Sequence, residues 1–172
     1  MGSRAGRPGM TLPQRWLAGC LVSAVGLAGA VVVPVAQGPG AGPLAAQKAA
    51  AASAPAAARL VRKINAARSA KGLRKLRVAD DLAAAAADRA RIMAGDGAAS
   101  HTPDLGSTLC CWSWLGENVG EAQSVRQAHR MFMRSAPHRV NVLSTKARQV
   151  GVAVVVRDGS LWVVEVFRHP AR

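Results

Sequence analysis

The C-terminal part of the chain has the sequence VGVAVVV at residues 150–156, RDGS at residues 157–160 and LWVVEVF at residues 161–167. The two outer segments are apolar and rich in β-branched residues, which fit the pleated surface of a strand. The pair Asp158-Gly159 suits the positive φ angles of a two-residue hairpin turn. This stretch therefore predicts two antiparallel strands joined by a short turn.

Neither strand shows a clean alternation of apolar and polar residues. A strand with one face in water alternates, whereas a strand covered on both faces is apolar throughout. Helices are therefore expected on both sides of the sheet. The sequence predicts an α/β/α sandwich, in which a small antiparallel sheet lies between helices.

Three helices are predicted upstream of the hairpin from apolar spacing and from start and stop signals. The first has Leu60, Ile64 and Ala67 on one face and stops at Gly72; the second starts at Asp80 or Asp81 and runs to Gly95; the third starts at Ser124 and ends before Ala136-Pro137. The second contains an alanine block at residues 83–87, whose small side chains allow a neighbouring element to approach closely. A long loop is expected at residues 97–116.

The 172 residues divide by composition into three parts. Residues 1–36 contain three arginines followed by an uncharged apolar stretch, which is typical of a signal peptide or of an uncleaved N-terminal membrane anchor. Residues 37–56 mix Gly, Pro, Ala and Lys and are interpreted as a low-complexity linker. Residues 57–172 form the predicted domain, which is expected to be secreted or anchored to the outer face of the cytoplasmic membrane.

The chain is strongly basic, with a formal net charge of +14. Eight bases fall between Arg59 and Arg77 without one acid. Outside a cell, the anionic partners expected for such a surface are cell-wall polymer and lipid headgroups rather than nucleic acid. Membrane contact through the N-terminal segment is expected if that segment is not cleaved. The alternative interpretation of the bases is a solvated helix face without a partner.

Two histidines and one acid, His101, Glu117 and His138, are the clearest candidate site residues. Two neutral imidazoles and one carboxylate suit zinc, with a fourth position left for water. Each has a structural alternative: a loop histidine bonded to backbone, an acceptor for loop amides, and a residue that satisfies carbonyls at a helix exit. Glu165 is a further acid within an apolar strand, where burial demands a partner and an edge position would expose it.

Trp112 and Trp114 lie close to Cys110 and Cys111 in the predicted loop. Alternating tryptophans suit contact with a lipid or a sugar ring, and burial against the domain is the alternative. Adjacent cysteines close a strained ring when bridged, so the sequence leaves their pairing open.

The order of these landmarks resembles the CAP superfamily, the cysteine-rich secretory, antigen 5 and pathogenesis-related type of domain, also called the SCP domain, in its short bacterial form. The resemblance runs from Leu60 to Phe167. Its pieces are Ile64 to Arg68, Gly72-Leu73 with Leu76, Leu82 through Met93, His101, Gly116-Glu117-Asn118-Val119, Ser135 to Asn141, Gly151 to Val154, and Trp162 to Phe167. Their order and spacing together are more specific than any single piece.

The resemblance implies a cavity in which two histidines and two acids gather and bind a divalent cation such as zinc. Matched by position, the histidines fall on His101 and His138 and one acid on Glu117. The other acid does not carry over, because Ser135 stands three residues after Phe132, where better-known members have the acid. The proposed metal ligands are therefore His101, Glu117 and His138, and no catalytic residue is assigned.

These observations favour an exported, non-catalytic binding module at the cell surface or outside the cell, with lipid, anionic cell-wall polymer or another protein as its partner. One alternative is a metal-assisted hydrolase of peptide or cell-wall material, which needs an acid to take a proton from the metal-bound water. A second alternative is a cationic adhesion protein that binds anionic wall polymer or lipid through its basic helix.

Overall fold

The structure, a computed structural model, describes residues 43–171, with side chains from Ala54 onward. The predicted signal peptide or anchor at residues 1–36 lies outside these residues. Within the described part of the chain, no helix has both the length and the hydropathy that a membrane span requires. The elements follow in the order α1 (Pro43–Ser69), β1 (Arg77–Val78), α2 (Asp80–Asp96), α3 (Leu105–Thr108), β2 (Trp112–Ala122), α4 (Val125–Arg134), α5 (Ala136–Val142), β3 (Gln149–Arg157) and β4 (Ser160–Pro170).

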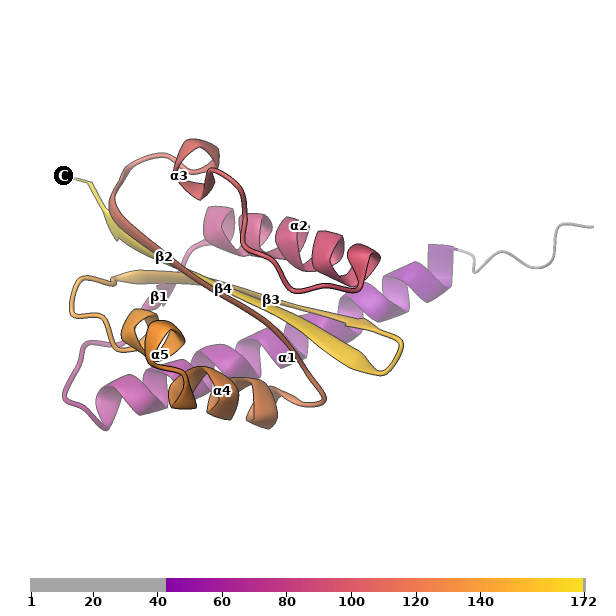
Figure 1. Ribbon diagram of the computed structural model, residues 1–172, viewed down its shortest axis with the longest axis horizontal. Helices are drawn as coiled ribbons and strands as arrows, with labels where there is room; N and C mark the ends of the chain where they lie inside the picture. Colours follow the sequence, from indigo (N-terminus) through magenta and orange to yellow (C-terminus); the bar gives the residue numbers. More distant parts are fainter. Residues whose placement is uncertain (1–42, 172) are drawn as a thin grey trace, which may run out of the picture. The chain divides into compact units, whose positions relative to one another are not determined.

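The four strands form one sheet in the order β1-β3-β4-β2, so β4 is central and β2 is an edge strand (Figure 1). The predicted hairpin is confirmed, because β3 and β4 pair antiparallel up to Arg157 and Ser160. The turn residues have the positive φ angles that the sequence demanded, 50° at Asp158 and 79° at Gly159. β2 pairs antiparallel with β4, and the short β1 pairs parallel with β3.

Helix α2 covers one face of the sheet, and α1, α4 and α5 cover the other (Figure 1). Each helix layer buries its own apolar core against the sheet. The core under α2 includes Leu82, Ala86, Met93, Val119, Val164 and Val166, and the core under α1 and α4 includes Leu60, Ile64, Phe132, Val163 and Phe167. The predicted α/β/α sandwich is therefore confirmed.

Helix α1 begins earlier than the sequence predicted. It starts at Pro43, inside the stretch interpreted as a linker, and Ala56 is buried in the core. The predicted domain boundary at residue 57 thus falls inside a helix. Alanine is the strongest helix former, so a low-complexity composition rich in alanine is compatible with a helix that continues from a packed domain. The helix ends at Ser69, and Gly72 follows with a φ of 68°.

The predicted starts of α4 and α2 are both confirmed, but only α4 has a side-chain cap, and the expected cap by Asp80 or Asp81 is wrong. The Ser124 hydroxyl accepts a hydrogen bond from the Gln127 backbone N–H at 3.1 Å and caps α4. At α2 the cap residue is Ala79, which offers no side-chain bond. The Asp81 carboxylate instead binds the Arg168 guanidinium of β4, with Nη2–Oδ1 at 3.1 Å. The Asp81 carboxylate therefore pairs with a charged donor on the sheet rather than with the free backbone N–H groups of the first helical turn.

The predicted loop is corrected in its bounds. The predicted loop at residues 97–116 contains the short helix α3 and ends at Trp112, where β2 begins, so Gly116-Glu117-Asn118 lies inside a strand. The third predicted helix ends before Ala136-Pro137 as expected, and Pro137 then occupies the first turn of α5, a position where a helix tolerates the missing N–H. His138 is therefore a helix residue.

The basic run between Arg59 and Arg77 is not a uniform solvated face. The Arg68 side chain is buried, and its guanidinium donates to the carbonyls of Val142 at 2.8 Å and Ser144 at 2.9 Å. It also donates to the Arg74 carbonyl at 2.9 Å. This arginine ties α1 to two loops, and the remaining bases are available for other roles.

Candidate functional site

His101 and Glu117 form a direct pair. His101 lies in the coil after α2, and Glu117 lies in the edge strand β2. His101 Nδ1 lies 2.7 Å from Glu117 Oε2. The same carboxylate accepts the Thr102 backbone N–H at 3.0 Å and the Thr102 hydroxyl at 2.5 Å. The Glu117 side chain is 6% exposed and the His101 side chain 63%. Glu117 thus holds the coil against the strand through three hydrogen bonds.

His138 has different partners. Its Nδ1 lies 2.8 Å from the Ser135 hydroxyl, and its ring packs against Phe132 with 5.1 Å between ring centroids. Burial, and secondly the charge of His101, lower the pKa of His138. The imidazole is therefore more completely neutral at pH 7 than an exposed histidine.

The pleat of β2 separates Glu117 from His138. A Cβ on Gly116 would meet the Asn141 side chain of α5 at 2.8 Å, so residue 116 faces the layer of α4 and α5. Successive strand residues point to opposite faces, which directs Glu117 toward the face of α2, like Val119 in the core under α2. His138, on α5, belongs to the other face.

The structure therefore brings His101 and Glu117 together and leaves His138 with Ser135. Both oxygens of Glu117 are engaged with Thr102, and no group of three or more His, Cys, Asp or Glu side chains among the described residues is placed to hold a metal ion. In this arrangement His101 and Glu117 bind each other and His138 binds Ser135, and zinc binding stays a prediction of the sequence.

A zinc titration of the purified chain tests whether the predicted zinc site exists. The sequence prediction expects uptake close to one zinc per chain, abolished in His138→Ala. The arrangement described above expects no uptake that depends on His138. Isothermal titration calorimetry of the unsubstituted chain and of His138→Ala, with His129→Ala as a matched histidine control, measures the difference.

A buried polar network lies under α5, on the face opposite Glu117. The Asn118 amide donates to Glu165 at 2.9 Å and to the His138 carbonyl at 3.2 Å. The Asn141 side-chain amide donates to the side-chain amide oxygen of Asn118, Oδ1, at 2.9 Å and to the Glu117 backbone carbonyl at 3.1 Å. These bonds fix α5 to the edge strand.

Glu165 has no exposed surface, and an edge position cannot explain it, because β4 is a central strand. Burial raises the pKa of Glu165 to about 8, and the Asn118 hydrogen bond opposes the shift. Oε1 of this carboxyl has no hydrogen-bond partner among the described residues. Glu165 is therefore largely protonated at neutral pH, which avoids a bare buried charge.

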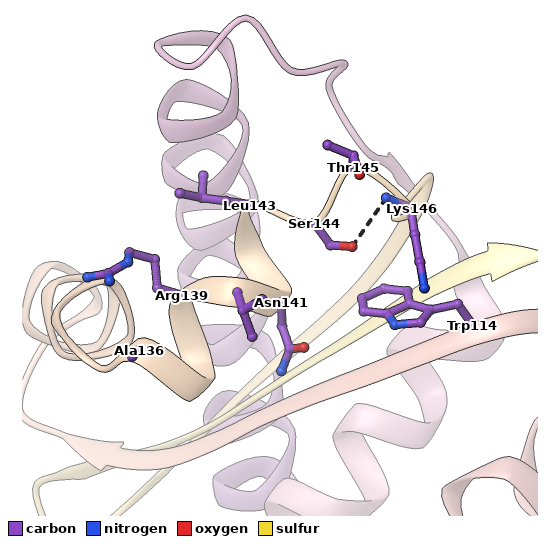
Figure 2. Close-up of a pocket in the computed structure, with 9 residues that line it drawn as sticks. Trp114, Ala136, Arg139, Asn141, Leu143, Ser144, Thr145 and Lys146 are labelled. Atoms are coloured by element: carbon purple, nitrogen blue, oxygen red, sulfur yellow. Dashed lines mark hydrogen bonds between the residues drawn. The ribbon is translucent and has the colours of Figure 1, made fainter.

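An open groove of about 610 Å³ lies alongside α5. Its walls come from β2, α5 and the segment after α5, and the lining residues are Trp114, Ala136, Arg139, Val140, Asn141, Leu143, Ser144, Thr145 and Lys146. We call it the Trp114 groove. Figure 2 shows Trp114 and Lys146 together at one end and Arg139 on the far side, with the Ser144 hydroxyl accepting from the Lys146 backbone N–H.

The floor of the Trp114 groove depends on the absence of a side chain at Gly116. A Cβ there would meet the Asn141 amide oxygen at 2.8 Å and the Trp114 indole at 3.0 Å. Two side chains from different elements thus pack over one glycine. Sequence analysis named Trp114 but missed Arg139, Ser144, Thr145 and Lys146, because only the packing of α5 on β2 brings them to the tryptophan.

The two tryptophans of β2 differ in their surroundings. Trp114 is half-buried and packs against the core, whereas Trp112 is 40% exposed and its indole N–H lies 3.1 Å from the carbonyls of Gly106 and Leu109. Cys110 and Cys111, just upstream, are both exposed free thiols. Of these residues, only Trp114 lines the groove.

The model of the cysteine-rich secretory protein family, CAP, matches residues 61–167. Among solved structures, a cysteine-rich secretory protein from Staphylococcus aureus is 25% identical with a TM-score of 0.60, and the match covers 68% of this chain and 39% of that chain. The chain thus spans well under half of that protein. No curated protein matches the sequence significantly.

Two further structures share the fold. An extracellular protein containing an SCP domain from Bacillus anthracis is 21% identical with a TM-score of 0.64, over 74% of this chain and 45% of that chain. An outer surface protein from Borrelia burgdorferi is 16% identical with a TM-score of 0.59, over 64% of this chain and 90% of that chain. At these identities the likeness concerns the fold alone.

Proposed function

The chain belongs to the cysteine-rich secretory protein family, CAP, and from that premise we propose that it is an extracellular, non-catalytic module that binds a glycan in the Trp114 groove. The extracellular location is supported by relatives described as an extracellular protein and an outer surface protein. The observation that carries the proposal is the composition of the groove.

A half-buried indole in an open groove suits a sugar ring, because the apolar face of the ring packs on the indole while its hydroxyls reach polar groups. The groove supplies these polar groups in the hydroxyls of Ser144 and Thr145 and in the cationic side chains of Arg139 and Lys146. Two cations favour a sugar polymer that carries carboxylates. We therefore name the ligand class as an acidic glycan of the cell wall.

The lining of the groove supports binding rather than turnover. None of its nine described lining residues is an acid or a histidine, so it offers no carboxylate or imidazole to act as general acid or base. Glu117 and His138, which the hydrolase alternative would use, lie on opposite faces of β2, and the carboxylate of Glu117 is engaged with Thr102. The geometry favours a binding module.

Trp114→Ala is expected to weaken binding of soluble muropeptides by about 30-fold, equivalent to about 2 kcal/mol for a buried aromatic contact. Isothermal titration calorimetry on the full chain measures it. Trp112→Ala removes the neighbouring indole of the same strand, outside the groove, and is expected to change the affinity by less than about twofold. Chito-oligosaccharides, which lack carboxylates, are expected to bind more weakly than muropeptides.

Trp114 also packs against the core, so Trp114→Phe serves as a second variant that keeps an aromatic ring. It is expected to retain part of the affinity, and thermal melting verifies that both variants are folded. The proposal is contradicted if Trp114→Ala binds as tightly as the unsubstituted chain. Cleaved muropeptides after incubation with the unsubstituted chain contradict the non-catalytic role.

A further inference from the structure

A second cavity, of about 530 Å³, lies where the segment before β1 approaches the start of β3 and the end of β4. It is lined by Arg74, Lys75, Arg77, Arg148, His169, Pro170 and Ala171. Four of these seven residues carry a permanent positive charge and none is acidic. We call it the basic cavity.

The backbone around the basic cavity is fixed by specific bonds. The Arg77 N–H donates to the Arg148 carbonyl at 3.1 Å where β1 joins β3, which sets the spacing of two of the arginines. Asn65 of α1 binds both the N–H and the carbonyl of Leu76, at 2.8 and 3.1 Å. The buried Arg68 holds the Arg74 carbonyl. The cations are therefore presented by an ordered frame.

The four cations have no charged partner among the described residues. The ion pairs of this part of the chain involve other arginines, such as Arg168 with Asp81. Arg148 Nη1 donates to the Ala147 and Thr145 carbonyls at 3.0 and 2.6 Å, which are neutral acceptors. The four cations repel each other, and no acidic side chain among the described residues offsets this repulsion. A bound anion would lower the electrostatic free energy of the cavity.

The size and the donors of the cavity narrow the class of anion. Guanidinium groups suit phosphate oxygens, to which they donate in pairs. The volume of about 530 Å³ far exceeds that of a single small ion, whose size is comparable with the roughly 30 Å³ of a water molecule. The cavity therefore fits a phosphate together with the groups on either side of it.

We propose that the basic cavity binds the phosphodiester group of an anionic polymer or lipid headgroup through Arg74, Arg77 and Arg148. The site is separate from the Trp114 groove and does not depend on it. The His169 ring donates to the Lys146 carbonyl at 2.6 Å, and Lys146 lines the groove, so the two sites meet at one segment. A long polymer can reach both sites at once, which favours a phosphodiester-linked wall polymer over a lipid. Only this preference for a polymer rests on the proposed function.

The test compares two pairs of substitutions that remove the same charge. Arg74→Gln with Arg77→Gln changes two exposed arginines of the cavity, whereas Arg59→Gln with Arg62→Gln changes two exposed arginines of α1 that do not line it. Both pairs keep Arg68 and Arg148, whose guanidinium groups hold backbone carbonyls. Thermal melting establishes that each variant is folded.

The probes are soluble poly(glycerol phosphate) and, separately, vesicles of phosphatidylglycerol in phosphatidylcholine. The cavity variant is expected to bind the polymer about 100-fold more weakly, about tenfold for each arginine. The slope of log affinity against log salt concentration is expected to fall by about two. The α1 variant is expected to change the affinity by less than about twofold. Sensitivity of vesicle binding alone to the cavity variant supports the same site with a lipid source.

Equal weakening in the two variants overturns the proposal, because binding is then a general effect of charge. Absence of binding to both probes by the unsubstituted chain overturns it as well. Trp114→Ala distinguishes failure of this proposal from failure of the proposed function. It is expected to weaken muropeptide binding by about 30-fold and to leave poly(glycerol phosphate) binding within about twofold of the unsubstituted chain.

Discussion

Gly151→Ala is expected to destabilise the domain by about 3 kcal/mol or more, at or above the upper end of overpacking effects in a close-packed core. A Cβ at this position in β3 would lie 2.1 Å from the Leu82 carbonyl carbon and 2.3 Å from the Ala83 backbone nitrogen. The clashing atoms belong to the backbone of α2, which cannot rotate away as a side chain can. Relief requires the whole helix to move from the sheet.

Urea denaturation measures the effect, and the expected loss is a large part of the 5–15 kcal/mol typical of a domain. Gly95→Ala is the control, and Gly95 lies in α2, the helix that packs on Gly151. A Cβ at Gly95 would meet only the Arg157 guanidinium, at 4.0 Å, so alanine is expected to stabilise α2 by up to about 1 kcal/mol through helix propensity. Equal stability of the two variants would show that α2 does not pack on Gly151 as described.

Glu165→Gln is expected to remove a fall in stability that the unsubstituted chain shows as the pH rises. Burial raises the pKa of Glu165 from its ordinary value of 4.5 to about 8. Between these two pH values the folded state holds the proton while the unfolded state releases it. Folding therefore binds a proton, and the free energy of unfolding decreases with pH until about pH 8 and then levels off.

The expected amplitude is on the order of 5 kcal/mol at most, because each pKa unit corresponds to about 1.4 kcal/mol. Urea denaturation of both chains at pH 5, 7 and 9 measures it, and the difference between the two chains isolates this one carboxyl. Glutamine keeps the oxygen that accepts from Asn118 and cannot ionise. Glu121→Gln, the same substitution at an exposed position of β2, controls for the loss of a carboxyl elsewhere.

Parallel pH curves for the unsubstituted chain and Glu165→Gln would contradict a protonated, buried Glu165. A further contradiction would be a variant that loses stability at pH 9, since the ionised carboxyl is the costly form there. The expected order is the reverse: Glu165→Gln is closest to the unsubstituted chain at pH 5 and most favoured relative to it at pH 9.

Several features of the fold could be predicted because their signals are local. Asp158-Gly159 specifies a hairpin through backbone angles that few residues adopt, and Ser124 specifies a helix start through one hydroxyl. The apolar pattern of the two C-terminal strands predicted that helices cover both faces of the sheet. The alanine block predicted that a neighbouring element approaches this helix closely, and β3 does so at Gly151. These features involve residues that are neighbours in sequence or a whole segment of uniform character.

The candidate site could be predicted only in part, because it depends on the strand that sequence analysis missed. The stretch around Gly116-Glu117-Asn118 is polar and glycine-containing, so it carries no apolar strand pattern, although it pairs with β4 along its length. Recognising a strand there would also have separated Glu117 from His138, since side chains alternate between faces. The pairing of Glu117 with His101, by contrast, brings together two of the three predicted residues.

The sequence by itself determined the sandwich of helices and hairpin and the resemblance to the family, because patterning and turn chemistry act within short segments. Only the tertiary structure decided which face of β2 each residue occupies, that Arg68 is buried, and that Trp114, Arg139 and Lys146 line one groove. The physical reason is that one step along a strand reverses the direction of a side chain. Partners across the fold are set by the packing of whole elements, which no single segment encodes.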